Sequence, residues 1–190
     1  EYDLASFIVG SVKRKKIIDS SSTRKGDVVI GLSSNGLHTN GYSLAIKVLL
    51  GNSKLKLDEK PKGLGVTLKD ELMKVHTSYL KPVSEVMDNV KAMAHITGGG
   101  LIENIPRVLP ENVSVELDKK SWKVHPIFSL IQKFGNISDE EMYGVFNMGI
   151  GFVIIVDKGD ANNILKSLAR YPFKSQIIGK VISGKAKRGL

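Results

Sequence analysis

The sequence contains no cysteine among its 190 residues. This absence excludes disulfide bonds, thiolate nucleophiles, iron–sulfur ligation and zinc sites built on cysteine. Long apolar runs are also missing: the longest, at residues 149–156, is far short of the ~20 residues that a membrane-spanning helix needs. We therefore expect a cytoplasmic protein that has no contact with a membrane.

Length and composition are typical of one globular domain. With 42% hydrophobic and 25% charged residues, the chain is not expected to be disordered, and 190 residues suit a single domain. Residues Glu1, Tyr2 and Asp3 carry neither a start methionine nor the basic stretch of a signal peptide. They are therefore expected to come from the middle of a longer chain.

Acidic residues are in deficit, and the net charge is +9 at pH 7. The basic run at residues 13–16 and the segment 171–190 together account for this excess, so the rest of the chain is balanced. No aromatic residue interrupts the basic run, so it lacks the stacking platform of a single-strand binder. We interpret both segments as solvated surface and expect no nucleic-acid partner. A nucleic-acid binder is the alternative, which a salt titration of DNA binding would test; we expect only weak, fully salt-sensitive association through residues 13–16 and the C-terminal tail.

Six segments have the β-branched or alternating pattern of strands. About six stretches with helical periodicity separate them, and capping boxes at residues 67–70 and 138–141 open two of these stretches. Strands interleaved with helices predict an α/β or α+β domain built around one sheet. The strands are expected at residues 5–12, 28–32, 92–96, 113–117, 152–156 and 176–182.

Several common catalytic motifs are absent. No two histidines lie within five residues of each other, as a helical zinc pair would require, and neither a nucleophile elbow nor a dinucleotide fingerprint occurs. Residues 179–186 approach a Walker A loop, but they lack its final Ser or Thr and no helix is expected after them. We expect no metal site in this chain.

Two glycine-rich turns remain, each expected between a strand and a helix. The first, residues 31–41, contains three glycines, two serines, a threonine, two asparagines and His38. Small residues let a backbone approach a ligand, and the amides at a helix start carry partial positive charge that suits phosphate. A plain helix cap at Thr39 or Asn40 would explain one of these residues but not the others.

The second turn, residues 95–100, contains His95, Thr97 and three successive glycines. Three successive glycines lose a large amount of backbone entropy on folding, and a tight turn requires only one glycine. The run therefore favours a nest of amide groups that binds an anion. His95 could instead be a histidine of the core. Two such turns predict a ligand cleft at the carboxyl ends of two strands.

Three phrases of the sequence resemble the aminoimidazole ribonucleotide synthetase family, also called phosphoribosylformylglycinamidine cyclo-ligases. They are SNGLHTNGYSL at 34–44, HITGGGLIENIPRVLP at 95–110 and EMYGVFNMGIG at 141–151. The continuation IPRVLP is the most specific part, because related phosphate-handling enzymes share only the glycine-rich style. The resemblance implies that residues 1–190 are the C-terminal, substrate-binding domain of a two-domain enzyme. Such a domain is α+β, with a mixed six-stranded sheet flanked by helices.

The resemblance also implies a reaction: ATP-dependent cyclisation of formylglycinamidine ribonucleotide to aminoimidazole ribonucleotide, in purine biosynthesis. It implies a homodimer, with ATP and Mg²⁺ held mainly by an N-terminal domain outside this chain. His38 and His95 are candidates for oxyanion stabilisation or proton transfer, because imidazole titrates near pH 7. The residues implied to bind substrate or phosphate are Ser34, Asn40, Gly41, Thr97, Gly98, Gly99, Gly100 and Asn147.

Other interpretations stay open. The formylglycinamidine synthase half, thiamine-phosphate kinase and selenophosphate synthetase belong to the same ATP-dependent superfamily, and turnover assays would separate them. A stand-alone anion-binding module would keep the cleft without a catalytic partner domain. Under the cyclo-ligase interpretation, this chain alone is expected to fold but to be inactive.

Overall fold

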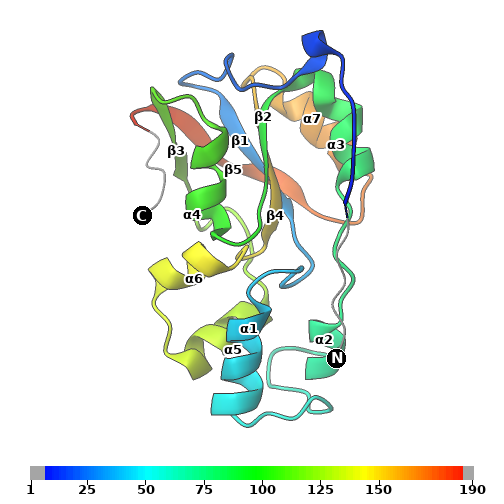
Figure 1. The fold of residues 1–190 in the computed structure, drawn as a ribbon, viewed down its shortest axis with the longest axis vertical. Helices are drawn as coiled ribbons and strands as arrows, with labels where there is room; N and C mark the ends of the chain where they lie inside the picture. The colour runs from blue at the N-terminus through cyan, green and yellow to red at the C-terminus, as the bar shows by residue number, and fades with distance from the viewer. Residues whose placement is uncertain (1–6, 186–190) are drawn as a thin grey trace.

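The computed structural model describes residues 7–185, and their strands form one sheet (Figure 1). Within this part of the chain the sheet has five strands in the order β2-β4-β1-β5-β3, each antiparallel to its neighbours. The strands are β1 (Val28–Ser33), β2 (Val90–His95), β3 (Val113–Leu117), β4 (Ile150–Val156) and β5 (Ser175–Ser183).

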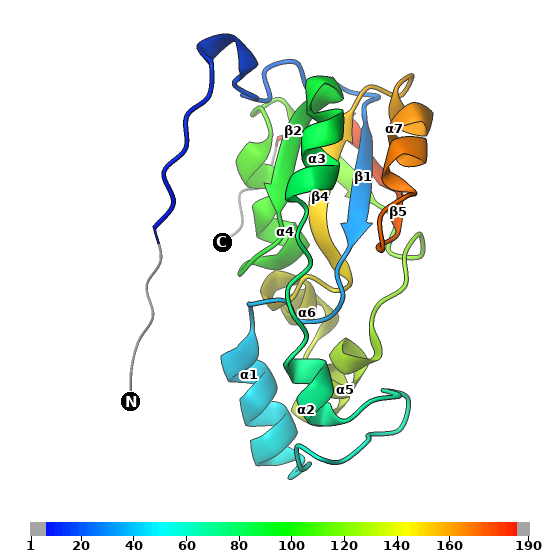
Figure 2. The ribbon, with the colours of Figure 1, turned by 90° about the vertical axis from the view of Figure 1, so that its right-hand side faces the viewer.

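The α+β class is confirmed, but the expected six strands and mixed directions are not. Residues 7–12 form no strand, and Phe7, Ile8 and Val9 are almost fully exposed. Figure 2 shows this part of the chain lying apart from the sheet. A β-branched pattern makes a strand only where a neighbouring edge supplies hydrogen bonds, and the described residues offer this segment none. Residues 5 and 6 lie outside the described part.

Both faces of the sheet are covered by helices. Successive side chains of a strand point to opposite faces, so Val28, Ile30 and Leu32 pack in one core while Val29 packs in the other. Figure 1 shows α3 and α7 on one side of the sheet and α4 on the other. The helices are α1 (Tyr42–Ile46), continued by a π-helix (Lys47–Asn52), α2 (Leu68–Leu72), α3 (Leu80–Val86), α4 (Gly100–Asn104), α5 (Pro126–Gly135), α6 (Asp139–Val145) and α7 (Ala161–Leu168).

The two expected capping boxes begin helices in the structure. The Thr67 hydroxyl accepts from the Asp70 amide at 3.0 Å, and the Ser138 hydroxyl accepts from the Glu141 amide at 3.2 Å. At the end of α5, Gly135 is the last helical residue. Asn136 takes the left-handed conformation, with φ 48°, because asparagine also tolerates that region.

Strand directions bring the two glycine turns to one edge of the sheet. Both β1 and β2 are antiparallel to β4, which lies between them, so β1 and β2 run the same way. Figure 2 shows their arrows pointing together toward α1, α2 and α6. The turn after β1, the turn after β2 and the segment before β4 therefore meet at this edge.

Candidate functional site

A hydrogen bond joins the two glycine turns directly. The amide of Gly98, in the second turn, donates to the Asn40 side-chain oxygen of the first turn at 3.1 Å. These residues are 58 positions apart in the sequence, and the sheet topology brings them together. The turns that composition indicated separately are therefore two walls of one candidate site.

The buried side chain of Asn147 fixes the backbone of the first turn through hydrogen bonds. Its side-chain nitrogen donates to the carbonyls of Gly36 and Leu37, at 2.9 and 3.2 Å. Its side-chain oxygen accepts from the Ser34 hydroxyl and from the Gly149 amide, both at 2.8 Å. Ser34 and Asn147 are buried, at 4% and 3% exposure, so the structure places both beneath the surface of the turn. They position its backbone.

His38 is also buried, at 3% exposure, and its backbone is left-handed with φ 57°. Its Nε2 accepts from the Asn35 amide at 3.3 Å, so the proton of the neutral ring is on Nδ1, an atom without a partner among the described residues. Burial, and then the charges of His76, His95 and His125, lower the pKa of His38 to about 3. The expectation that His38 titrates near pH 7 is therefore wrong.

The ring of His38 packs against the start of β4, where only a glycine fits. A Cβ atom at Gly151 would lie 2.5 Å from Cε1 of His38 and would overlap the Tyr79 hydroxyl. That hydroxyl donates to the Ser33 carbonyl at 2.8 Å, and burial raises the pKa of Tyr79. The first turn is thus clamped to the sheet on the side away from solvent.

A third histidine, which the sequence analysis did not select, completes a cluster of imidazoles. His76, in the loop before α3, stacks on His38 with ring centroids 3.9 Å apart, and its Nε2 lies 3.2 Å from Nε2 of His95. His95 is exposed at the end of β2 and stacks on Phe152. Partial burial lowers the pKa of His95; burial, and then the charge on His95, lower the pKa of His76.

Asn104, at the end of α4, holds the second turn. Its side-chain nitrogen donates to the carbonyls of Gly98 and Gly100 at 3.1 and 2.8 Å, and its side-chain oxygen accepts from the Thr97 hydroxyl at 3.1 Å. The Gly100 amide donates to the Thr97 carbonyl at 3.0 Å. Two glycine amides of the expected nest, those of Gly98 and Gly100, are therefore engaged within the protein.

The successive glycines meet different demands. Gly99 and Gly100 are left-handed, with φ 97° and 56°, and a Cβ at Gly100 would overlap the Tyr143 carbonyl oxygen. Gly98 is not left-handed, and a Cβ there would find only the Asn40 oxygen, at 4.0 Å. The fold thus requires the second and third glycines, whereas the space above Gly98 is open for a ligand to approach.

Gly41 is likewise required by packing. It precedes α1 with φ 76°, and a Cβ there would overlap the Phe146 ring. The alternative interpretation, a cap at Thr39 or Asn40, is wrong, because Gly41 itself is the N-cap and Asn40 turns toward Gly98.

Carboxylates near the turns are already paired. Glu71 is buried and bonds Lys74 at 2.6 Å, and Glu103 beside Gly99 bonds Arg107 at 2.5 Å. No group of three or more His, Asp or Glu side chains within residues 7–185 could hold a metal ion. Within the described residues, the carboxylates of Glu71 and Glu103 are thus engaged by basic side chains.

A largely apolar cavity of about 510 Å³ opens beside the histidine cluster. His76 and His95 form one wall, and Tyr79, Met93 and Phe152 are among the other lining residues. Three large apolar side chains are exposed around it or on the same loop: Met73, Val75 and Leu80, at 72–85% exposure.

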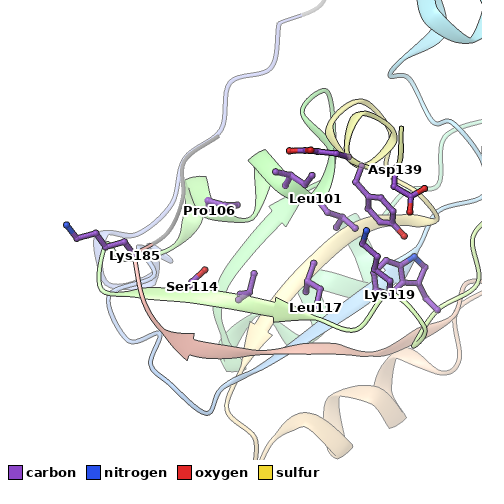
Figure 3. Close-up of a pocket in the computed structure, with 12 residues that line it drawn as sticks. Leu101, Pro106, Ser114, Leu117, Lys119, Asp139 and Lys185 are labelled. Carbon is purple, nitrogen blue, oxygen red and sulfur yellow. The ribbon is translucent and has the colours of Figure 1, made fainter. Parts of the chain in front are cut away.

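A second cavity, of about 570 Å³, lies between α4, β3 and α6 (Figure 3). Its walls include Leu101 and Leu117, and the Lys119 ammonium lies 4.2 Å from the centre of the Tyr143 ring. None of the site residues expected from the sequence lines it.

The structure also bears on membranes. No helix within residues 7–185 is long and apolar enough to cross a bilayer.

The fold and the joined glycine turns define the class to which the protein belongs. The family described as "AIR synthase related protein, C-terminal domain" matches residues 24–189, so the chain belongs to this family. Among curated proteins it is 48% identical to the phosphoribosylformylglycinamidine cyclo-ligase of Pseudothermotoga lettingae, over 97% of this chain and 54% of that protein. It matches the protein of the same name from Bacillus thuringiensis (strain Al Hakam) at 48% identity, with the same coverage. The chain thus spans about half the length of these relatives.

Solved structures share the fold at low sequence identity. HypE of Escherichia coli, a hydrogenase maturation protein, matches 87% of this chain and 47% of its own, with TM-score 0.55 and 18% identity. Phosphoribosylformylglycinamidine synthase II of Thermotoga maritima matches 90% of this chain and 24% of its own, with TM-score 0.54 and 12% identity. These likenesses confirm the α+β class of the fold.

Proposed function

We propose that this chain is the substrate-binding half of an ATP-dependent cyclo-ligase that converts formylglycinamidine ribonucleotide to aminoimidazole ribonucleotide. The observation that carries the proposal is the bond between Asn40 and Gly98, which makes one site of the two glycine turns. The 48% identity to proteins named as this cyclo-ligase supports the choice of reaction. We place the enzyme in the cytoplasm, as a homodimer without nucleic-acid or membrane partners.

The reaction has two steps in this proposal. The formyl amide oxygen attacks the γ-phosphorus of ATP and ADP leaves, so that the oxygen becomes a phosphate ester. An amidine-derived nitrogen then attacks the same carbon, phosphate leaves and the nitrogen loses a proton, which closes the imidazole ring. Catalysis therefore needs a group that receives a proton and a site that holds phosphate oxygens.

The solvent exposure of each candidate residue indicates which of these two tasks it can perform. His95 reaches the surface and is the candidate for proton transfer. His38 is neutral, and its Nδ1–H is shielded from solvent against Gly151, so we place it as a support of the first turn and not as an acid–base group or an oxyanion donor. Asn40, Thr97 and Gly98 lie where the two turns meet, and we propose that phosphate approaches there through the Asn40 side-chain nitrogen and the open space above Gly98. The remaining expected residues hold the turns in position from beneath or by their backbone conformation; they are Ser34, Gly41, Gly99, Gly100 and Asn147.

ATP and Mg²⁺ also have to be held for this reaction, and the residues 7–185 show no group of three or more metal-binding side chains. We propose that they are held mainly by the part of the relatives that the chain does not match. The exposed side chains of Met73, Val75 and Leu80, next to the histidine cluster, support this, because apolar patches of this kind mark surfaces that pack against another part of a protein.

The test is ATP-dependent phosphate release with formylglycinamidine ribonucleotide, measured on a form of the protein extended to the length of its relatives. Formylglycinamide ribonucleotide, thiamine phosphate and selenide serve as competing substrates for the related enzymes. We expect turnover with the first substrate alone, and a loss of at least tenfold in His95→Ala, the low side of what positioned acid–base groups contribute. Turnover with another substrate, or phosphate binding without turnover, would overturn the proposal.

A further inference from the structure

His76 contacts both walls of the site at once, although it belongs to neither glycine turn. Its ring stacks on His38, its Nδ1 lies 3.3 Å from the Thr39 hydroxyl, and its Nε2 lies 3.2 Å from Nε2 of His95. Through Thr39 and His95, one side chain from the loop before α3 spans from the first turn to the end of β2.

The contact between His76 and His95 restricts where protons can be. A hydrogen bond between two imidazole nitrogens needs one N–H and one lone pair. If Nδ1 of His76 accepts from Thr39, its Nε2–H donates to His95, and neutral His95 then carries its proton on Nδ1. If Thr39 accepts instead, both assignments reverse. The tautomer of His95 is therefore tied to that of His76, and the contact cannot form when both rings are fully protonated.

The groups around His76 also favour the neutral form of its ring, which the contact with His95 needs. The ionisable groups that face its ring are His38 from the first turn and His95 from β2, and Tyr79 lies beyond His38. The carboxylate of Glu71 on α2 is paired with Lys74. Burial and neighbouring imidazoles thus favour neutral rings, which keeps the hydrogen bond between His76 and His95 intact at neutral pH.

We propose that His76 is a positioning residue that fixes the orientation of the exposed His95 ring at the mouth of the site and couples the tautomer of that ring to its own. Apart from Phe152, which stacks on it, His95 has no other side-chain partner recorded in the described part of the chain. Without His76 its ring would be free to turn. The role in catalysis rests on the proposed function, whereas the effect on the state of the His95 ring does not.

The test compares wild type with His76→Phe, which keeps a flat ring on His38 but removes both nitrogens, and with His76→Gln, which keeps one hydrogen-bonding group. Lys81→Ala is the matched control, because this nearby side chain is exposed at the start of α3. The first readout is the ¹⁵N imidazole NMR spectrum of His95 across pH. We expect the His95 tautomer ratio of wild type to be kept in Lys81→Ala, to change in His76→Phe and to be partly restored in His76→Gln.

The second readout is turnover in the extended protein. For His76→Phe we expect kcat to fall by about tenfold with KM little changed, and the acidic limb of the pH–rate profile to move in step with the His95 titration. An NMR change without turnover in any variant would contradict the proposed function and leave the positioning role intact. Identical His95 spectra in wild type and His76→Phe, or failure of both variants to fold, would overturn the positioning role.

Discussion

Replacing His38 with asparagine should remove a specific part of the protein's sensitivity to acid. His38 is buried and neutral, and burial lowers its pKa to about 3, against about 6.5 for a histidine in an unfolded chain. Between these two values the unfolded state binds a proton that the folded state does not. Stability therefore rises with pH across this window and is unaffected by His38 above about pH 7.

The expected magnitude follows from the width of the window. One proton changes the free energy of unfolding by about 1.4 kcal/mol per pH unit, so wild type should lose about 2.5 kcal/mol through His38 between pH 7.5 and pH 4.5. Asparagine tolerates the left-handed backbone at this position. It leaves a cavity that should cost about 1–2 kcal/mol at every pH.

The assay is urea unfolding at several pH values from 4.5 to 7.5. The difference in unfolding free energy between wild type and His38→Asn should shrink, or change sign, as the pH falls. Leu37→Val is the control, because it trims a buried neighbour of the same turn and should cost about 1 kcal/mol at all pH values. A wild-type curve that stays parallel to that of His38→Asn from pH 7.5 to 4.5 would refute the assignment of His38 as a buried, neutral imidazole.

Three further predictions concern the turns and the proposed division of the enzyme. Gly100→Ala should destabilise the protein by at least 3 kcal/mol in thermal or urea unfolding, because its Cβ would overlap backbone and its φ is left-handed. Gly98→Ala should change the free energy of unfolding by no more than about 0.5 kcal/mol but should weaken phosphate binding. Equal losses of stability in the two variants would refute this distinction. Asn147→Ala should lower the free energy of unfolding by about 3 kcal/mol and Ser34→Ala by about 1 kcal/mol, because Asn147 loses more hydrogen bonds than Ser34. A larger loss of stability in Ser34→Ala than in Asn147→Ala would be inconsistent with Asn147 as the centre of the network. The 190-residue chain should fold but release no phosphate from ATP; activity within a hundredfold of the extended form, roughly 3 kcal/mol in barrier, would contradict the proposal that ATP is held elsewhere.

Much of the fold was predictable because buried strands leave a plain pattern in the sequence. Runs of β-branched residues such as those in β1 and β4 match their positions in the sheet closely. The sixth strand, expected at residues 5–12, was wrong because the same pattern carries no information about a pairing edge. Strand direction was equally out of reach, since periodicity does not tell parallel from antiparallel neighbours.

The candidate site was predictable only where its residues lie together in the sequence. Both glycine turns stood out by composition, and the structure joins them through Asn40 and Gly98. His76 was missed because it lies 19 residues from His95 and 38 from His38, in a loop without a glycine motif beside it. Asn104 was inside a recognised phrase, but its role depends on four hydrogen bonds that only the folded turn displays.

The central claim is that the two glycine turns form one phosphate-binding site. The most direct measurement is the backbone amide NMR spectrum of the ¹⁵N-labelled chain during titration with formylglycinamidine ribonucleotide, beside a titration with inorganic phosphate. The account predicts that shifts concentrate in residues 39–41 and 97–99, and that both segments follow one binding curve. Shifts confined to the basic residues 13–16 or to the cavity between α4, β3 and α6, or different curves for the two turns, would contradict it.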